Sequence, residues 1–540
     1  MRHYILGALR ISTLVLAVTV IAAGAQEMKP PQVSGVYADW QLAVELAALD
    51  ALNARREETS GGEPSERPLD ELNAATGTRF PNIAASPVPV LLPFDSAAFL
   101  RDRKAIAPEA QPGAANRAAN YLFGFNSIPF FYAGPGGYDA VVVARANEMR
   151  DLGLSFSDPI YIDVSGSAFL YELAEPTGMI EWPTRGLNEF PGVRRVFLDD
   201  AVRYTFVRYG VPYVISIDCF DGGSRFRTIS CREADKVAVR ALKSLRLVGG
   251  MPQAAGTSSG VLTIDRPTIQ STVFTYHSPG DLIAGTGFKD KRGVADYTVF
   301  SGMRFPIAQA PAFANSQSFL NSGDCESSGW SSAGTRDGLP AYRCRVSGQA
   351  LVWDEAAGEN YSYPWRDNFC EMRHFQVGQC PAGLGHQGQD IRPALCRQRA
   401  PGDRCEPYIH DVVAARDGMV LRAPGQAGLY LVVNAPGERV RFRYLHMLPK
   451  QLDATGMVSG RLVREGEIIG KVGNFLGGAT ATTYHLHFDL QVPTKYGWVF
   501  VNPYMTLVAS YERLIEARGQ EIKENIPAVP SGVAATQTAQ

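Results

Sequence analysis

Four histidines and one aspartate in the last third of this 540-residue chain have the types and the spacing of a metal-dependent hydrolytic site. His386 and Asp390 lie four residues apart, His485 and His487 lie two apart, and His446 stands between the two pairs. Imidazole nitrogens and carboxylate oxygens are ligand atoms that zinc prefers. These five residues therefore predict a zinc site in the C-terminal third of the chain.

The distribution of the histidines along the chain favours a metal site over a purely structural role. A lone histidine is more often a hydrogen-bonded structural residue than a ligand, and an H-x-H pair also arises by chance. Six of the eight histidines, however, fall between positions 374 and 487. We interpret the remaining two of these six, His374 and His410, as surface or loop residues.

The strands around these residues must bring them to one cleft. Residues two apart on a strand point to the same side, so His485 and His487 share one face of a sheet. Asp489 lies further along that face, where a carboxylate can orient an imidazole from behind. His446 ends a neighbouring strand-like run and is expected to reach the same cleft.

The pattern beyond residue 409 predicts an antiparallel sheet, because apolar runs alternate between glycine turns. Strands are expected at 412–415, 418–422, 429–434, 440–446, 468–472, 485–492 and 498–501. Around His386 and Asp390 a helix is disfavoured, since each of the glycines at 383, 385 and 388 weakens a helix by about 1 kcal/mol. We expect a loop that leads into a strand there.

The first half of the chain predicts a domain in which strands and helices mix. Strands are expected at 88–92, 140–144, 160–164, 204–208 and 213–217, and helices at 38–56, 140–151 and 234–245. The helix at 140–151 competes with a strand over its first five residues. Gly-Pro-Gly-Gly at 134–137 predicts a turn and not a phosphate-binding loop. No catalytic motif is found in this half.

Length and composition suggest the domain organisation. A chain of this length is long for one core, and a linker rich in Gly, Ser, Ala and Pro begins at 249. The fold class expected is an α+β N-terminal domain followed by a mainly antiparallel β domain. The divisions expected are a signal peptide (1–25), a mixed α/β domain (26–250), a linker with short strands (251–300), the β domain (301–510) and a C-terminal tail (511–540) with a helical segment at 511–517.

The N-terminus predicts export. Arg2 and Arg10 precede an apolar run at 11–23, and small residues at 23–25 are typical of a signal peptide cut after Ala25. The run is shorter than the roughly 20 residues that a membrane-spanning helix needs. The mature protein is therefore expected in the periplasm or secreted, with no membrane attachment. Lys and Arg total 52 against 54 Asp and Glu, so the charge predicts no nucleic-acid partner.

All eight cysteines lie in the part that would be exported, where disulfides are expected. Sequential pairing is the simplest of the 105 connectivities that eight cysteines allow. It joins four pairs: Cys219/Cys231, Cys325/Cys344, Cys370/Cys380 and Cys396/Cys405. A structural zinc site is disfavoured because no Cys-x-x-Cys motif is present.

The order of the histidine motifs resembles that of the lysostaphin-type, or LytM-like, zinc metallopeptidases, which cut peptidoglycan cross-bridges. H-x-G-x-D at 386–390, Tyr-x-His at 444–446 and H-L-H-F at 485–488 carry the resemblance. It extends to the segments at 417–420, 463–473 and 501–503 and so covers about residues 305–503. A cysteine-bearing loop after Asp390 and a long insertion before His386 depart from the family pattern and leave substrate preference open.

The resemblance implies zinc ligands at His386, Asp390 and His487, with one zinc ion per chain. Three protein ligands leave the fourth tetrahedral position to a water molecule, as a catalytic zinc requires. The resemblance also implies catalytic roles for His446 and His485. One of these would take a proton from the water and the other would stabilise the oxyanion, and the sequence leaves open which is the base.

The function implied is that of an exported zinc metalloendopeptidase that hydrolyses the peptide cross-links or stems of peptidoglycan. One alternative is a non-catalytic LytM-like protein that binds the cell wall or activates an amidase. Such members lack ligands, whereas all three ligands and both histidines are present here. A third interpretation is a secreted peptidase that acts on proteins, since a groove for glycine-rich peptides need not be restricted to the wall.

Overall fold

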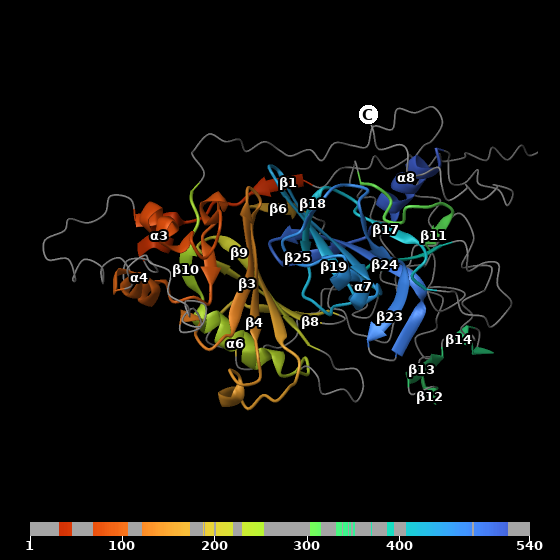
Figure 1. Ribbon diagram of the computed structural model, residues 1–540, viewed down its shortest axis with the longest axis horizontal. Coiled ribbons are helices and arrows are strands. Elements are labelled where there is room, and N and C mark those ends of the chain that lie inside the picture. The colour runs from red at the N-terminus through yellow and green to blue at the C-terminus, as the bar shows by residue number, and fades with distance from the viewer. Residues whose placement is uncertain are drawn as a thin grey trace, which may run out of the picture.

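The computed structural model describes two sheet-containing parts of the chain, which we call the N-terminal part (residues 68–252) and the C-terminal part (residues 303–516) (Figure 1). The predicted signal peptide, the linker beyond residue 252, His277, His374 and three of the four cysteine pairs lie outside the described residues. Among the residues described, no helix is long and apolar enough to cross a membrane. The described residues are 32–45, 68–105, 121–172, 187, 190–198, 201–219, 229–252, 303–314, 331–336, 339–343, 345–346, 349–350, 365, 369, 386–393, 407–477 and 480–516.

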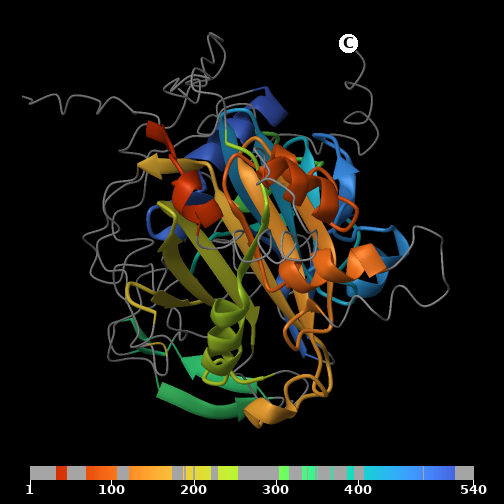
Figure 2. The ribbon, with the colours of Figure 1, turned by 90° about the vertical axis from the view of Figure 1, so that its left-hand side faces the viewer.

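The N-terminal part is built on a six-stranded antiparallel sheet with strand order β3-β4-β5-β9-β8-β7. Its strands are β3 (Ser127–Gly134), β4 (Gly137–Ala144), β5 (Ile160–Ser167), β7 (Arg194–Phe197), β8 (Ala201–Arg208) and β9 (Val211–Asp218). Figure 2 shows the helices in front of these strands. They are α3 (Pro68–Thr76), α4 (Ser96–Ala105) and α6 (Ala234–Ser244), and they cover the side of the sheet that faces away from the C-terminal part.

Shorter elements complete this half of the chain. The pairs β1 (Gln32–Gly35) with β6 (Phe169–Glu172) and β2 (Val90–Leu92) with β10 (Arg246–Gly249) are antiparallel. The short helices are α1 (Trp40–Ala43), η2 (Ile83–Ala85) and η4 (Arg150–Leu152). A disulfide joins Cys219 to Cys231, which confirms the first of the predicted pairs.

The helix predicted at 140–151 is wrong. Residues 140–144 belong to β4, which pairs with β3 on one side and β5 on the other, and every residue of β4 is buried. An apolar Ala-Val-Val-Val-Ala run fits a strand covered on both faces, and valines are stiff in a helix. The pairing available in the sheet therefore outweighs the weak helical pattern. The helix predicted at 38–56 has only α1 within the described residues, whereas α6 matches its prediction closely.

The C-terminal part contains a nine-stranded sheet that is antiparallel as predicted, with strand order β11-β16-β24-β20-β19-β18-β21 and with β23 and β25 also paired to β24. The strands are β11 (Ala312–Ala314), β16 (Gln389–Pro393), β18 (Gly418–Leu421), β19 (Leu429–Ala435), β20 (Glu438–Leu445), β21 (Leu462–Val463), β23 (Gly473–Gly477), β24 (Thr480–Thr494) and β25 (Gly497–Val501). Because β24 pairs with four other strands, it is the centre of this part.

Smaller elements flank this sheet. Three two-stranded sheets join β17 (Asp411–Val413) to β22 (Ile468–Lys471), β12 (Ser331–Arg336) to β13 (Leu339–Arg343) and β14 (Arg345–Val346) to β15 (Gln349–Ala350). The helices are α7 (Pro449–Ala454) and α8 (Tyr504–Ile515). The helical segment expected at 511–517 thus begins earlier, at Tyr504. Tyr511 is 2% exposed and its ring packs against Phe305 and Trp365, so α8 belongs to the core beyond the expected boundary at 510.

The two faces of β20 differ because its sequence alternates. Val440, Phe442 and Tyr444 lie in the hydrophobic core of the C-terminal part. Arg439, Arg441 and Arg443 point to the opposite face and are nevertheless 0–2% exposed. A buried face that carries three guanidinium groups requires partners from another layer.

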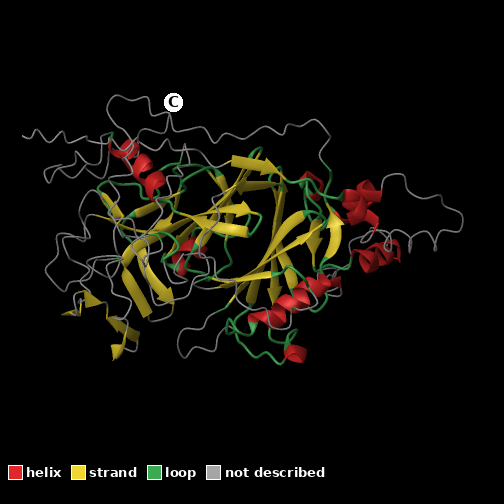
Figure 3. Ribbon diagram, turned by 180° about the vertical axis from the view of Figure 1, so that it is seen from behind, coloured by secondary structure: helices red, strands yellow, loops and turns green. Residues whose placement is uncertain are grey.

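The N-terminal sheet supplies that layer. Phe130 and Val141 pack in one apolar cluster with Met419, Leu421 and Val432 of the C-terminal sheet. Figure 3 shows the two sets of strands adjacent when the molecule is seen from behind. The described structure is therefore layered, with helices, then the six-stranded sheet, then the nine-stranded sheet.

The Gly-Pro-Gly-Gly turn between β3 and β4 is hydrogen-bonded to the C-terminal sheet at one end of this interface. The amide of Gly136 donates a 2.6 Å hydrogen bond to Oδ1 of Asn434, and Nδ2 of Asn434 donates to the carbonyl of Gly137 at 3.2 Å. A Cβ atom at position 136 would lie 2.7 Å from Oδ1 of Asn434. Glycine is therefore needed there for the close approach of the two parts.

Asp139 forms ion pairs with two of the arginines at the interface. Its carboxylate lies 2.7 Å from Nη1 of Arg439 and is in contact with Nη2 of Arg441, and all three side chains are at most 2% exposed. The guanidinium of Arg441 also stacks on Trp498, at 4.2 Å from the ring centroid. Burial by itself would raise the pKa of Asp139, but Arg439 and Arg441 hold that pKa below its ordinary value.

We expect an Asp139→Ala variant to lose about 3–5 kcal/mol of the free energy of unfolding, because it leaves two buried guanidinium groups without their carboxylate. Chemical denaturation at neutral pH measures this loss. The lowered pKa means that the ionised carboxylate stabilises the fold above its unfolded-state pKa, so the difference from wild type is expected to shrink only below about pH 4. Arg461→Ala is the control, since it removes an exposed ion pair with Glu467 that contributes little.

Candidate metal centre

Strand pairing around β24 brings the predicted site residues together. Asp390 of β16 lies opposite His487 of β24, and Leu445, next to His446, lies opposite His487 from the other side. His386 stands in the loop before β16, so the predicted loop leading into a strand is what the structure contains. His485 pairs with Gly473 of β23. Three separate stretches of sequence thus converge on β24.

Three ligand atoms form a small triangle at the centre of this site. Nε2 of His386 lies 2.8 Å from Nδ1 of His487 and 3.1 Å from Oδ1 of Asp390, and the third side, from Nδ1 of His487 to Oδ1 of Asp390, is 3.2 Å. Tetrahedral zinc ligands at about 2.0–2.1 Å from the metal lie about 3.3 Å apart. The triangle therefore has the size that one zinc ion requires. His386, Asp390 and His487 are also the group within the described residues whose atoms could hold a metal ion.

The charge of the triangle suits a cation. Burial would raise the pKa of Asp390, but His386 and His485 keep that pKa well below its ordinary value, so the carboxylate is ionised. Burial would lower the pKa of His487, but its contacts with the carboxylates of Asp390 and Asp489 outweigh burial and raise this pKa to about 9. Two carboxylates around one imidazole favour positive charge here, whether from a proton or from a metal ion.

Asp489 sets the orientation of His487, as the strand periodicity predicted. Its Oδ2 lies 3.3 Å from Nε2 of His487, and Arg443 contacts the same oxygen. Because the carboxylate accepts a hydrogen bond, it holds the proton on Nε2, and Nδ1, which faces His386 and Asp390, is the nitrogen that a metal ion would bind in place of a proton. Metal-binding histidines are commonly held by a carboxylate in this way.

His446 and His485 form an imidazole pair beside the triangle, with ring centroids 4.7 Å apart. Burial is the main cause that lowers the pKa of both, and for His446 the neighbouring His485 and His487 lower it further. Both rings are therefore neutral at neutral pH. His446 follows β20 with φ of 70°, a left-handed conformation that non-glycine residues rarely adopt. This turn in the backbone places its Nδ1 3.1 Å from the carbonyl oxygen of Phe475.

No protein-family model and no curated protein matches the chain. Among solved structures, local likenesses include a candidate glycyl-glycine endopeptidase LytM of Ruminococcus gnavus, with 25% identity, 22% of this chain and 45% of that chain covered, and a TM-score of 0.17. Lysostaphin of Staphylococcus simulans is 19% identical over 28% of this chain and 51% of its own, with a TM-score of 0.17. Helicobacter pylori Csd3 is 21% identical over 24% of this chain and 32% of its own, with a TM-score of 0.14.

These likenesses cover a minor share of this chain, and the chain spans about half or less of each of the three proteins.

Gly388 allows β16 to approach β24 closely enough to form the triangle. A Cβ atom at this position would lie 2.5 Å from the carbonyl oxygen of Phe488 and 2.9 Å from Nε2 of His487. Both distances are shorter than real Cβ contacts, and the backbone oxygen has no freedom to move aside. The glycine in the H-x-G-x-D motif is thus required by the packing of the two strands.

We expect Gly388→Ala to cost about 1–3 kcal/mol of folding free energy, as overpacked sites do, and to weaken zinc binding because Asp390 is displaced from His487. Calorimetric unfolding and competition for zinc with a chromophoric chelator measure the two effects. Gly35→Ala is the matched control, since an added Cβ meets nothing within 4 Å there. Equal zinc affinity in both variants would contradict this role for Gly388.

His410, the other histidine among the described residues, is not part of the ligand triangle. Nδ1 of His410 lies 2.9 Å from the hydroxyl of Tyr484, and its side chain is half-buried. His410 lies in a bend just before β17, in agreement with its interpretation as a loop residue. Sequence reasoning missed Arg443 and Gln491, although both lie at two-residue spacing on strands whose other members were recognised.

A cavity of about 190 Å³ lies between the two sheets. Tyr161 and Ser216 line it from the N-terminal part, and Tyr430, Arg422 and Arg443 line it from the C-terminal part. Arg443 links this cavity to the candidate metal centre, because it also contacts Asp489.

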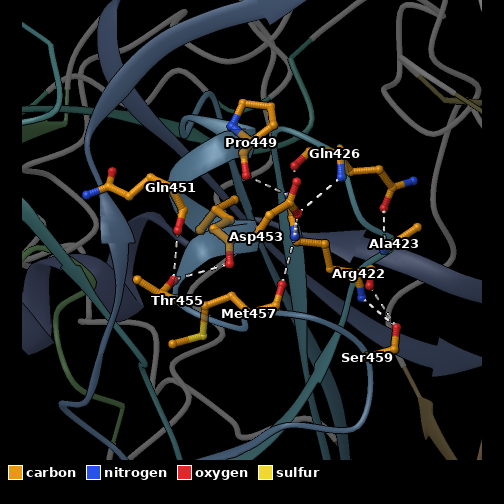
Figure 4. Close-up of polar contacts among 11 residues, drawn as sticks. Arg422, Ala423, Gln426, Pro449, Gln451, Asp453, Thr455, Met457 and Ser459 are labelled. Atoms are coloured by element: carbon orange, nitrogen blue, oxygen red, sulfur yellow. Dashed lines mark hydrogen bonds and ion pairs between the residues drawn. The ribbon is translucent and has the colours of Figure 1, made fainter.

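Arg422 at this cavity is committed to structural contacts (Figure 4). Its guanidinium donates to Oδ1 of Asp453 at 2.7 Å and to the carbonyls of Met457 and Gln426, each at 2.9 Å. Burial by itself would raise the pKa of Asp453, but the hydrogen bond from Arg422 holds it below its ordinary value. Arg422 therefore ties the end of β18 to α7.

Proposed function

We propose that this protein is an exported zinc metalloendopeptidase that hydrolyses amide bonds in the peptide cross-links or stems of peptidoglycan. The observation that supports it most is the triangle of His386, Asp390 and His487 with a neutral imidazole pair beside it. Peptidoglycan as the substrate, and a periplasmic or secreted location, follow from the motif resemblance and the signal-peptide pattern.

The donor set fits zinc, since two imidazole nitrogens and one carboxylate oxygen at tetrahedral spacing are the ligands of many catalytic zinc sites. Bound there, zinc would lower the pKa of a water molecule and polarise the scissile carbonyl. A residue set with three protein ligands and further unliganded histidines is typical of a catalytic site and not of a closed structural one.

His446 is arranged to accept a proton. Its Nδ1 donates to the carbonyl of Phe475, so its Nε2 carries the lone pair. Nε2 of His485 lies 3.3 Å from Oδ1 of Asp390 and donates to it, which leaves its Nδ1 as an acceptor. Each neutral ring can take the proton of the attacking water and then, as an imidazolium, deliver one to the leaving amine or stabilise the oxyanion. The two histidines thus share the acid and base roles.

Digestion of purified peptidoglycan by the mature protein, with zinc content measured in the same preparation, tests the proposal. Stoichiometric zinc and new amino termini in the stem or bridge peptides, identified by mass spectrometry, are the expected result. Zinc without any cleavage of peptidoglycan, but with cleavage of glycine-rich proteins, would move the substrate from the wall to proteins. A metal-free protein that binds peptidoglycan without cutting it would overturn the enzyme assignment in favour of a wall-binding protein.

A further inference from the structure

The sheet face that carries the candidate ligands continues into a polar row buried between the two sheets. Along β24 this face holds His487, Asp489 and Gln491, which are 3%, 0% and 0% exposed. Arg203 of β8, in the N-terminal part, reaches the same row and is 3% exposed. Polar groups buried this deeply need defined partners.

Hydrogen bonds connect these four residues in sequence. Nε2 of His487 lies 3.3 Å from Oδ2 of Asp489, and Oδ1 of Asp489 accepts a 2.9 Å bond from Nε2 of Gln491. Oε1 of Gln491 accepts a 2.9 Å bond from Nη2 of Arg203. Nη1 of Arg203 donates to the carbonyl of Trp498 at 2.6 Å, which anchors the guanidinium on β25.

The chemistry of the two ends fixes the direction of every bond in this row. A carboxylate only accepts and a guanidinium only donates, so the amide of Gln491 can face them in one orientation alone. Asp489 also forms an ion pair with Arg443. Burial lowers the pKa of Arg203 to about 10, which still leaves it charged at neutral pH.

We propose that Arg203 is a positioning residue for the metal centre, so that the N-terminal part completes a site whose ligands all come from the C-terminal part. Resting on the zinc-binding function proposed above, this inference assigns the row from Arg203 through Gln491 and Asp489 the task of holding the ring of His487. With the ring held, Nδ1 of His487 points toward His386 and Asp390. The N-terminal sheet therefore contributes to metal affinity as well as to stability.

Arg203 could instead be one of several contacts that only hold the sheets together. Ser165 provides the matched comparison, since its hydroxyl accepts a 3.0 Å hydrogen bond from Nε1 of Trp498 across the same interface. Ser165 is 2% exposed, close to the 3% of Arg203, but has no hydrogen bond to the row that leads to His487. Loss of either contact is expected to weaken the interface. Of the two, only the loss of Arg203 is expected to weaken metal binding.

The test measures zinc affinity of the full chain by competition with a chromophoric chelator, and the visible absorption of the cobalt(II)-loaded protein. Arg203→Met and Gln491→Met are expected to weaken zinc binding by about 10-fold, at the low end for residues behind a ligand, and to change the cobalt spectrum. Arg203→Lys keeps the charge but cannot make both hydrogen bonds of the guanidinium group. Its zinc affinity should therefore lie between those of Arg203→Met and wild type. Ser165→Ala should match wild type in both readouts.

The outcomes separate this inference from the proposed function. Wild-type zinc affinity and cobalt spectrum in Arg203→Met and Gln491→Met would overturn the positioning role while leaving the zinc enzyme intact. Equal weakening in Ser165→Ala would also overturn it, because general loosening of the interface would then explain the effect. Failure of the wild-type chain to bind zinc would refute the proposed function and this inference together. If Arg203→Met does not fold, Gln491→Met and Arg203→Lys decide.

Discussion

A His386→Ala variant is expected to bind zinc at least about 100-fold more weakly than wild type. Because it loses the metal, it should also lose hydrolytic activity. Residues that merely orient a ligand change affinity by about 10–100-fold, so removal of a ligand should exceed that range. His386 provides two of the three sides of the ligand triangle, 2.8 Å to His487 and 3.1 Å to Asp390. Chelator competition and metal analysis after dialysis measure the loss.

His410→Ala is the control for this experiment, because His410 lies in the same part of the chain but contacts Tyr484 outside the triangle. It should retain zinc and activity. Full zinc occupancy in His386→Ala would show that the metal, if present, lies elsewhere, and the assignment of Asp390 and His487 would fail with it.

A His485→Ala variant is expected to retain zinc and to hydrolyse its substrate about 10²–10⁴-fold more slowly, which is the usual contribution of a general acid or base. His485 is fully buried beside His446, and its Nε2 contacts Asp390 without closing the triangle. The rate of hydrolysis should therefore fall more than the affinity for zinc. Steady-state rates on a defined stem or bridge peptide, with zinc content determined on the same sample, measure both.

The comparison with His386→Ala makes the result decisive. Loss of zinc from His485→Ala to the same extent as from His386→Ala would make His485 a ligand and not an acid or base. Unchanged rates with zinc retained would leave His446 as the sole candidate for proton transfer. Only a slow, zinc-loaded variant agrees with the shared role proposed for the two histidines.

Contacts between the two sheets give the N-terminal sheet an expected role in stability and in metal binding. The N-terminal sheet contains no catalytic motif, but it covers the face of β20 that carries three arginines and contributes Asp139 to it. Its Arg203 reaches Gln491 of the neighbouring strand β24. Asp139 offsets part of the charge of Arg439 and Arg441, and Arg203 donates to Gln491 and to the carbonyl of Trp498, so each sheet supplies partners for buried polar groups of the other. Stability and metal binding are therefore expected to respond to substitutions in both parts.

Residue type and local spacing are enough to predict several features of this protein. His485, His487 and Asp489 share a face because a strand repeats every two residues, and this required no knowledge of the fold. The antiparallel strands of the C-terminal part and helix α6 follow from equally local patterns. The Cys219–Cys231 disulfide joins residues only 12 apart and was predictable for the same reason.

Other features depend on partners that lie far away in the sequence and become visible only in the folded chain. Residues 140–144 form a strand because β3 and β5 lie on either side of them, which outweighs their own helical pattern. Arg203 lies 288 residues before Gln491, and no local pattern indicates that the two are hydrogen-bonded. The sequence thus predicted which side chains would hold a metal, whereas the packing of one sheet on the other decided which residues hold those side chains in place.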